Sequence, residues 1–129
     1  MVLPDRESSV KVVAVHGIFS SADVWAQLQE VLAGDGELSG RVDFLPFEYP
    51  SPKRGFGRTR KVPDINTIAD YFGTFLDLNT NSYDRILVIA HSQGGLVVQR
   101  YLVRMIERRN LRKARQICSL IMYATPNAR

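Results

Sequence analysis

Apolar residues along the chain gather in four short runs, each of which has the length of a β-strand. The runs cover Val10–Val15, Val42–Phe47, Arg85–Ala90 and Ile117–Tyr123. The first and third hold one charged residue each, as is typical of strands that are buried on both faces of a parallel sheet. We therefore predict four strands.

Between these runs, apolar residues recur every three or four positions, which is the spacing of an amphipathic α-helix. The pattern predicts helices over Ser21–Leu32, from the N-cap Asp64 to Leu76, and over Gln93–Arg108. The inward positions are Val24, Trp25, Leu28, Val31 and Leu32 in the first helix, Ile65, Ile68, Ala69, Phe72, Phe75 and Leu76 in the second, and Val97, Val98, Tyr101, Leu102, Met105 and Ile106 in the third. Alternating strands and helices predict the α/β fold class, with a mainly parallel sheet of about four strands and helices on both faces.

Positive charge is concentrated in two segments, Lys53–Lys61 and Arg100–Arg115, and the formal net charge of the chain is +4. Arg100, Arg104 and Arg108 recur every four residues, which is typical of the solvated face of a helix. Aromatic residues do not alternate with the basic ones, as a surface that stacks nucleic-acid bases would require. We expect no nucleic-acid partner, and we interpret Lys53–Lys61 as a surface loop.

The rest of the composition excludes several classes of protein. Cys118 is the single cysteine, so an internal disulfide and a cysteine-based zinc site are excluded, and we expect Cys118 to be a small buried residue. No apolar run is long enough to cross a membrane, and the N-terminus has no apolar signal region. We expect a cytoplasmic protein without a metal or organic cofactor.

The third strand leads directly into the sequence His91-Ser92-Gln93-Gly94-Gly95 and then into a helix. A serine at a strand-to-helix turn between small residues is the pattern of a nucleophile elbow. The flanking residues Ala90 and Gly94 are small, which lets the strand and the helix approach each other. The N–H of Gln93 then lies at the helix N-terminus, where the helix dipole favours a developing oxyanion.

The first strand ends in His16-Gly17-Ile18-Phe19. Glycine lets this loop turn so that a backbone N–H, that of Ile18, points towards Ser92. The carboxyl ends of parallel strands meet at one edge of a sheet, where open α/β sheets place their ligands. We therefore expect the two strand ends to form one site.

Three segments of the chain, VVAVHGIF, VIAHSQGGLV and LIMYATPNAR, together resemble the first half of an α/β-hydrolase of the lipase and esterase type. The resemblance implies that Ser92 is the nucleophile and that Ile18 and Gln93 supply the oxyanion hole. It further implies that the residues supporting the site loops are His16, Gly17, His91 and Gly94. The segment after Tyr123 departs from the family pattern T-P-H-x-G, because Asn127 stands where the histidine is usual.

The triad of this family runs serine, acid, histidine along the chain. After Ser92 the sequence has one acidic residue, Glu107, and no histidine. Glu107 lies within the helix that follows the elbow, and the loop role of His16 makes it an unsuitable base. We therefore interpret residues 1–129 as a single partial α/β-hydrolase domain, with the acid and the histidine expected beyond residue 129.

These observations predict a serine hydrolase that cleaves carboxylic esters or lipids through an acyl-enzyme, and a small-molecule or lipid ester as its substrate. The 129 residues alone are expected to show little or no turnover, because they lack the triad acid and histidine. The alternative is a non-catalytic, hydrolase-like module that serves recognition or signalling in a longer protein.

Overall fold

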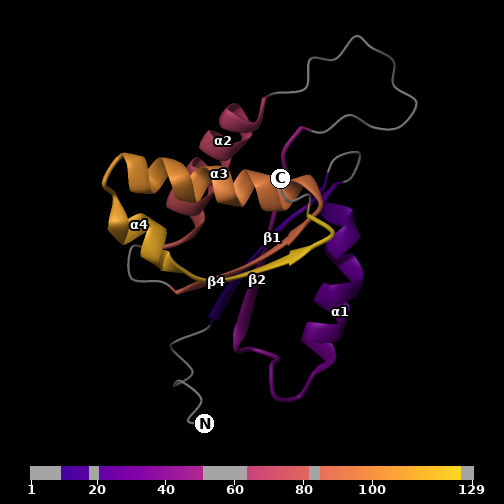
Figure 1. Ribbon diagram of the computed structural model, residues 1–129. Helices are drawn as coiled ribbons and strands as arrows, with labels where there is room; N and C mark the ends of the chain where they lie inside the picture. The colour runs from indigo at the N-terminus through magenta and orange to yellow at the C-terminus, as the bar shows by residue number, and fades with distance from the viewer. Residues whose placement is uncertain (1–9, 18–20, 51–63, 82–84, 126–129) are drawn as a thin grey trace, which may run out of the picture.

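The computed structural model describes residues 10–17, 21–50, 64–81 and 85–125. Its elements, in chain order, are β1 (Val10–Val15), the 3-10 helix η1 (Ala22–Trp25), α1 (Ala26–Gly34), β2 (Val42–Phe47), α2 (Ile65–Asn79), β3 (Ile86–His91), α3 (Gln93–Glu107), α4 (Leu111–Gln116) and β4 (Ile117–Tyr123). Figure 1 shows these elements as one layered unit. None of the helices within the described ranges is long and apolar enough to cross a membrane.

The four strands form one parallel sheet in the order β2-β1-β3-β4. Val15 at the end of β1 pairs with Phe47 of β2 and with Ala90 of β3. The residues that follow these strand ends therefore meet at one edge of the sheet, although they are far apart in the sequence. The predicted fold class is confirmed.

The two faces of the sheet are covered by different helices (Figure 1). α2 and α3 lie on one face and α1 lies on the other. The core beneath α2 and α3 is built from branched and aromatic side chains, among which the Phe72 ring contacts Phe47 and Tyr101 at centroid distances of 5.4 and 5.2 Å. These edge-on ring pairs join β2, α2 and α3 into one packed layer.

The first predicted helix differs from the structure. Its first turn is the 3-10 helix η1, which Ser21 caps by accepting a hydrogen bond from the Asp23 N–H. A 3-10 helix has three residues per turn, so a face with a period of 3.6 does not continue through it. Trp25 is buried as predicted, but Val24 and Val31 are 49% and 63% exposed, so their predicted inward positions are wrong.

The third predicted helix ends one residue early, at Glu107, and a separate helix, α4, follows it. Arg109 has a φ of 56°, which breaks the helix, and the Asn110 side chain caps α4 by accepting a hydrogen bond from the Lys113 N–H. The sequence pattern did not predict α4. It also placed Ile106 inward, whereas that side chain is 58% exposed.

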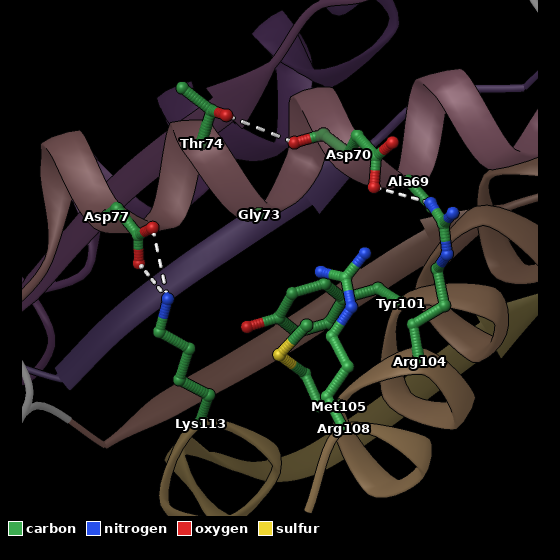
Figure 2. A pocket seen from close by; sticks show the side chains of 10 residues that line it. All are labelled: Ala69, Asp70, Gly73, Thr74, Asp77, Tyr101, Arg104, Met105, Arg108 and Lys113. Carbon is green, nitrogen blue, oxygen red and sulfur yellow. Dashed lines mark hydrogen bonds and ion pairs between the residues drawn. The ribbon is translucent and has the colours of Figure 1, made fainter. Parts of the chain in front are cut away.

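The arginines of α3 do not form a purely solvated stripe, because two of them join α3 to α2. Arg100 donates to the Asn66 side chain at 2.6 Å, and Arg104 forms an ion pair with Asp70, which Figure 2 shows. The regular spacing of these arginines thus serves the contact between the two helices.

Cys118 lies in β4, at the edge of the sheet formed by the described strands. It is exposed, so the prediction of a buried cysteine is wrong. β4 pairs with β3 on one side, and the burial of the other strands does not extend to its residues. A strand of apolar residues is therefore not a sufficient sign of burial when that strand is at an edge.

Candidate functional site

Ser92 lies between β3 and α3 in a strained backbone conformation, with a φ of 53° and a ψ of −126°. Residues other than glycine rarely adopt a positive φ. Such backbone strain persists only where the surrounding structure enforces it. Two hydrogen bonds hold the turn. The Ser92 N–H donates to the Tyr123 carbonyl at 2.8 Å, and the Gly95 N–H donates to the Ser92 carbonyl at 3.1 Å. The backbone is that of the predicted sharp strand-to-helix turn.

Gly94 lets the first turn of α3 pass directly over the end of β1. A Cβ atom at this position would lie 2.5 Å from the Val15 carbonyl oxygen and 2.6 Å from that of His16. Both atoms belong to the main chain and cannot move aside as a flexible side chain does. Glycine is therefore required here by close approach, and Ala90 on the preceding strand is fully buried.

Gly17 brings the end of β1 against the Ser92 turn. A Cβ atom on Gly17 would lie 2.8 Å from the Cβ of Ser92 and 3.1 Å from the Nδ1 of His91. The two strand ends singled out in the sequence are therefore in contact. Ile18, the other predicted oxyanion donor, lies outside the described residues, as do Lys53–Lys61 and Asn127.

The end of β4 forms a third side of the turn. A Cβ atom on Gly95 would overlap the side chain of Thr125, whose Oγ1 is buried without a hydrogen-bond partner among the described residues. Together with the bond from the Ser92 N–H to the Tyr123 carbonyl, this contact packs the end of β4 against the start of α3. The sequence pattern did not indicate this contact.

His16 is fully buried and is held by hydrogen bonds on both ring nitrogens. Its Nε2 accepts from the Tyr49 N–H at 3.2 Å, so the ring proton is on Nδ1, which donates to the Gly17 carbonyl at 2.9 Å. The Tyr49 hydroxyl donates to the His16 carbonyl at 2.7 Å, and the two rings are stacked with their centroids 4.0 Å apart.

These contacts determine the chemistry of His16. Burial lowers its pKa below the ordinary value of 6.5, which favours the neutral ring. A neutral imidazole acts as a base through its free lone pair, and here that lone pair accepts the Tyr49 N–H. His16 is therefore tied to Gly17 and Tyr49 and is not placed to accept a proton from Ser92.

His91 lies beside Gly17, and its Nδ1 is buried without a hydrogen-bond partner among the described residues. Within this part of the chain, neither histidine forms a hydrogen bond with the Ser92 hydroxyl. Gln93 is the first residue of α3, so its N–H lies at the positive end of the helix dipole. In the described ranges, no group of three or more His, Cys, Asp or Glu side chains could hold a metal ion.

Sequence reasoning missed Tyr49, although a signal for it was present. Tyr49 follows the last residue of β2 by two positions, and the sequence predicts that strand to belong to the same mainly parallel sheet as β1. An aromatic residue just past the end of such a strand lies at the edge of the sheet where the site forms.

A separate cleft of about 300 Å³ lies between α2 and the later turns of α3, with α4 closing one end (Figure 2). The Lys113 side chain forms an ion pair with Asp77 at 3.1 Å across it, and Arg104 pairs with Asp70. Ser92 lies at the other end of α3, so this cleft is not part of the Ser92 site. Its charged side chains pair with one another.

The sequence profile described as the alpha/beta hydrolase family matches residues 12–127. The chain belongs to this family. The match includes the His16-Gly17 loop, the Ser92 turn and the end of β4, which are the segments that the structure brings together. No curated protein sequence matches the chain significantly.

Several solved structures resemble this chain in fold. The RedJ thioesterase of the prodiginine pathway in Streptomyces coelicolor is 21% identical over 84% of this chain and 38% of its own, with a TM-score of 0.56. Phospholipase PlaB from Legionella pneumophila, in complex with thio-NAD, is 23% identical over 91% and 25%, with a TM-score of 0.63. The type II thioesterase YbtT is 15% identical over 86% and 41%, with a TM-score of 0.53. This chain thus spans less than half of each.

The strain at Ser92 predicts an unusual response to glycine. Ser92→Ala and Ser92→Gly both remove the hydroxyl, but only glycine tolerates positive φ without cost. The glycine variant is expected to be more stable than the alanine variant by about 1 kcal/mol in urea unfolding, followed by Trp25 fluorescence. At a residue with negative φ, the glycine variant would instead be the less stable of the two. That result at Ser92 would contradict the presence of backbone strain.

The close approach at Gly94 predicts that Gly94→Ala lowers the free energy of unfolding by roughly 1–3 kcal/mol, the usual cost of overpacking. Gly34→Ala is the matched control, since nothing lies within 4 Å of a Cβ at that helical position. The control is expected to leave stability unchanged or to raise it slightly. Equal effects of the two substitutions in urea unfolding would show that α3 does not press on β1.

The buried His16 predicts that stability falls in mild acid. Its pKa is lowered in the folded chain, so below about pH 6.5 the unfolded chain binds more protons and the free energy of unfolding decreases. Urea unfolding between pH 7.5 and pH 5.5 measures this loss. His16→Gln is expected to reduce the pH dependence, whereas His91→Gln, which keeps His16, should retain it. An unchanged pH dependence in His16→Gln would contradict the assignment.

Proposed function

We propose that this chain supplies the nucleophile and the oxyanion donors of a serine hydrolase that cleaves carboxylic esters, including lipid esters. The observation that carries the proposal is the strained Ser92 turn with the Gly17 loop packed against it. A strained serine between a strand and a helix is the arrangement that exposes a nucleophile at the edge of an α/β sheet. Gly94 and His91 would keep that turn in place.

In the proposed reaction, the Ser92 hydroxyl oxygen attacks the acyl carbon and its proton passes to a histidine. The carbonyl oxygen becomes an oxyanion, which the N–H groups of Gln93 and Ile18 stabilise. The oxyanion then collapses, the bond to the alcohol oxygen breaks, and the histidine returns its proton to the leaving alcohol. Water hydrolyses the acyl-enzyme by the same steps and releases the acid.

We place the histidine and the acid of this reaction outside residues 1–129. The lone pair of His16 is occupied, and His91 has no hydrogen bond to Ser92. Glu107 is at the last residue of α3, about 20 Å along the helix from Gln93. A carboxylate at that distance cannot orient a base beside Ser92.

The structural neighbours support an acyl substrate. Two of them are thioesterases and one is a phospholipase, and each name describes cleavage at an acyl carbon or of a lipid ester. We therefore favour a small-molecule or lipid ester for this chain. The second candidate is a non-catalytic module for recognition or signalling, which would have the same fold without a histidine and an acid beside Ser92.

The proposal predicts covalent labelling of Ser92 by a fluorophosphonate probe in a polypeptide that carries this chain together with its histidine and acid. Ser92→Ala is expected to abolish labelling and ester hydrolysis, because the attacking oxygen is lost. Ser39→Ala, an exposed serine in the turn before β2, is the matched control and should label as the parent does. Labelling of Ser92→Ala at the parent's level would refute the assignment, and an unlabelled parent would favour the non-catalytic module.

The 129 residues alone provide a second control. Their hydrolysis of p-nitrophenyl butyrate is expected to lie close to background, because removal of triad groups leaves only binding and oxyanion stabilisation. Rapid hydrolysis that His16→Ala abolishes would show instead that His16 is the base.

A further inference from the structure

Tyr49 contacts His16 in three ways, through its backbone N–H, its hydroxyl and its ring. We propose that Tyr49 is a positioning residue of the ester-cleaving site, which holds the main chain of His16 and Gly17 against the Ser92 turn. This inference rests on the proposed function, because it concerns the orientation of the oxyanion loop during ester cleavage.

The sheet register places Tyr49 beside this loop. Phe47 pairs with Val15 at the ends of the two strands, and Tyr49 and Gly17 each follow their strand end by two residues. The Tyr49 side chain is 3% exposed and its ring lies 5.8 Å from that of Phe47, which anchors it to the core. Tyr49 therefore connects the packed interior to the loop at the end of β1.

Tyr49 fixes two successive carbonyl groups of the loop. Its hydroxyl donates to the His16 carbonyl directly. Its N–H holds the His16 ring, whose Nδ1–H in turn donates to the Gly17 carbonyl. These contacts fix the main chain of His16 and Gly17, which leads directly into the residue proposed as an oxyanion donor.

Burial makes this arrangement rigid. His16 is fully buried and neutral, and burial raises the pKa of Tyr49 to about 12, so its hydroxyl remains a donor at any physiological pH. If the hydroxyl is removed, the His16 carbonyl loses a hydrogen-bond partner in a buried setting. The His16 and Gly17 main chain is then held less firmly against the Ser92 turn.

Tyr49→Phe is the sharpest variant, because it removes only the hydroxyl and keeps the stacked ring and the backbone N–H. Tyr101→Phe is its matched control. Tyr101 is also buried, at 2% exposure, and its pKa is likewise raised to about 12, but it lies in the middle of α3 away from Ser92. A general effect of deleting a buried phenol hydroxyl would appear in both variants.

The experiment measures kcat and KM for p-nitrophenyl butyrate in a polypeptide that carries this chain with its histidine and acid. Loss of one oxyanion donor typically lowers the rate about 10²–10³-fold, so a misdirected donor in Tyr49→Phe is expected to lower kcat roughly 10–100-fold with KM changed less than about threefold. Tyr101→Phe should leave both values within about twofold. A kcat for Tyr49→Phe equal to that of Tyr101→Phe would overturn the positioning role.

The failure of this inference differs from the failure of the proposed function. If Ser92→Ala is still labelled by a fluorophosphonate, the function itself is wrong. If Ser92→Ala is inactive while Tyr49→Phe keeps its kcat, only the positioning role is wrong.

A measurement on the unmodified 129-residue chain covers the case in which Tyr49→Phe does not fold. Nitrogen NMR of the His16 ring is expected to show a proton on Nδ1 and an acceptor at Nε2. The opposite tautomer would remove both the Tyr49 and the Gly17 contacts and would overturn the inference.

Discussion

The close approach of α3 to the end of β1 is the constraint on which the rest of the site depends. A single Cβ atom at Gly94 would meet two main-chain carbonyl oxygens, at 2.5 and 2.6 Å. Because the helix passes so near, the chain must turn from β3 into α3 within one residue. That residue is Ser92, and its positive φ is the local consequence of a packing requirement between a helix and a neighbouring strand.

The surroundings of Ser92 explain how this strain is maintained. The turn is enclosed by three strand ends: Gly17 after β1, the Tyr123 carbonyl at the end of β4, and β3 itself. Buried His16 and Tyr49 hold the first of these strand ends in place through hydrogen bonds between uncharged groups. The packed core of the parallel sheet thus holds the residues at its carboxyl edge in a fixed geometry, and open α/β sheets place their ligands at that edge.

The sequence predicted the four strands, three of the helices and the contact between the two loops, since each depends on local periodicity or on a glycine beside a strand end. One error has a local cause, and the others arise where tertiary contacts decide. Val24 is exposed because η1 changes the helical period, and Cys118 is exposed because β4 is at an edge. Arg104 serves helix packing because α2 presents Asp70 to it. Tyr49 was missed because its role depends on a register between strands that are far apart in sequence.

The sequence by itself determined which residues stand at the turns: a serine between small residues after one strand, and a histidine and glycine after another. These are local properties, because a sharp turn and a close approach each require particular residue types. Only the tertiary structure decided what the histidine does. Packing placed Tyr49 beside it, which fixed the tautomer of His16 and occupied its lone pair. The structure thus supplies the physical reason why His16 is an unsuitable base, since the lone pair that accepts the Tyr49 N–H is not free to take a proton from Ser92.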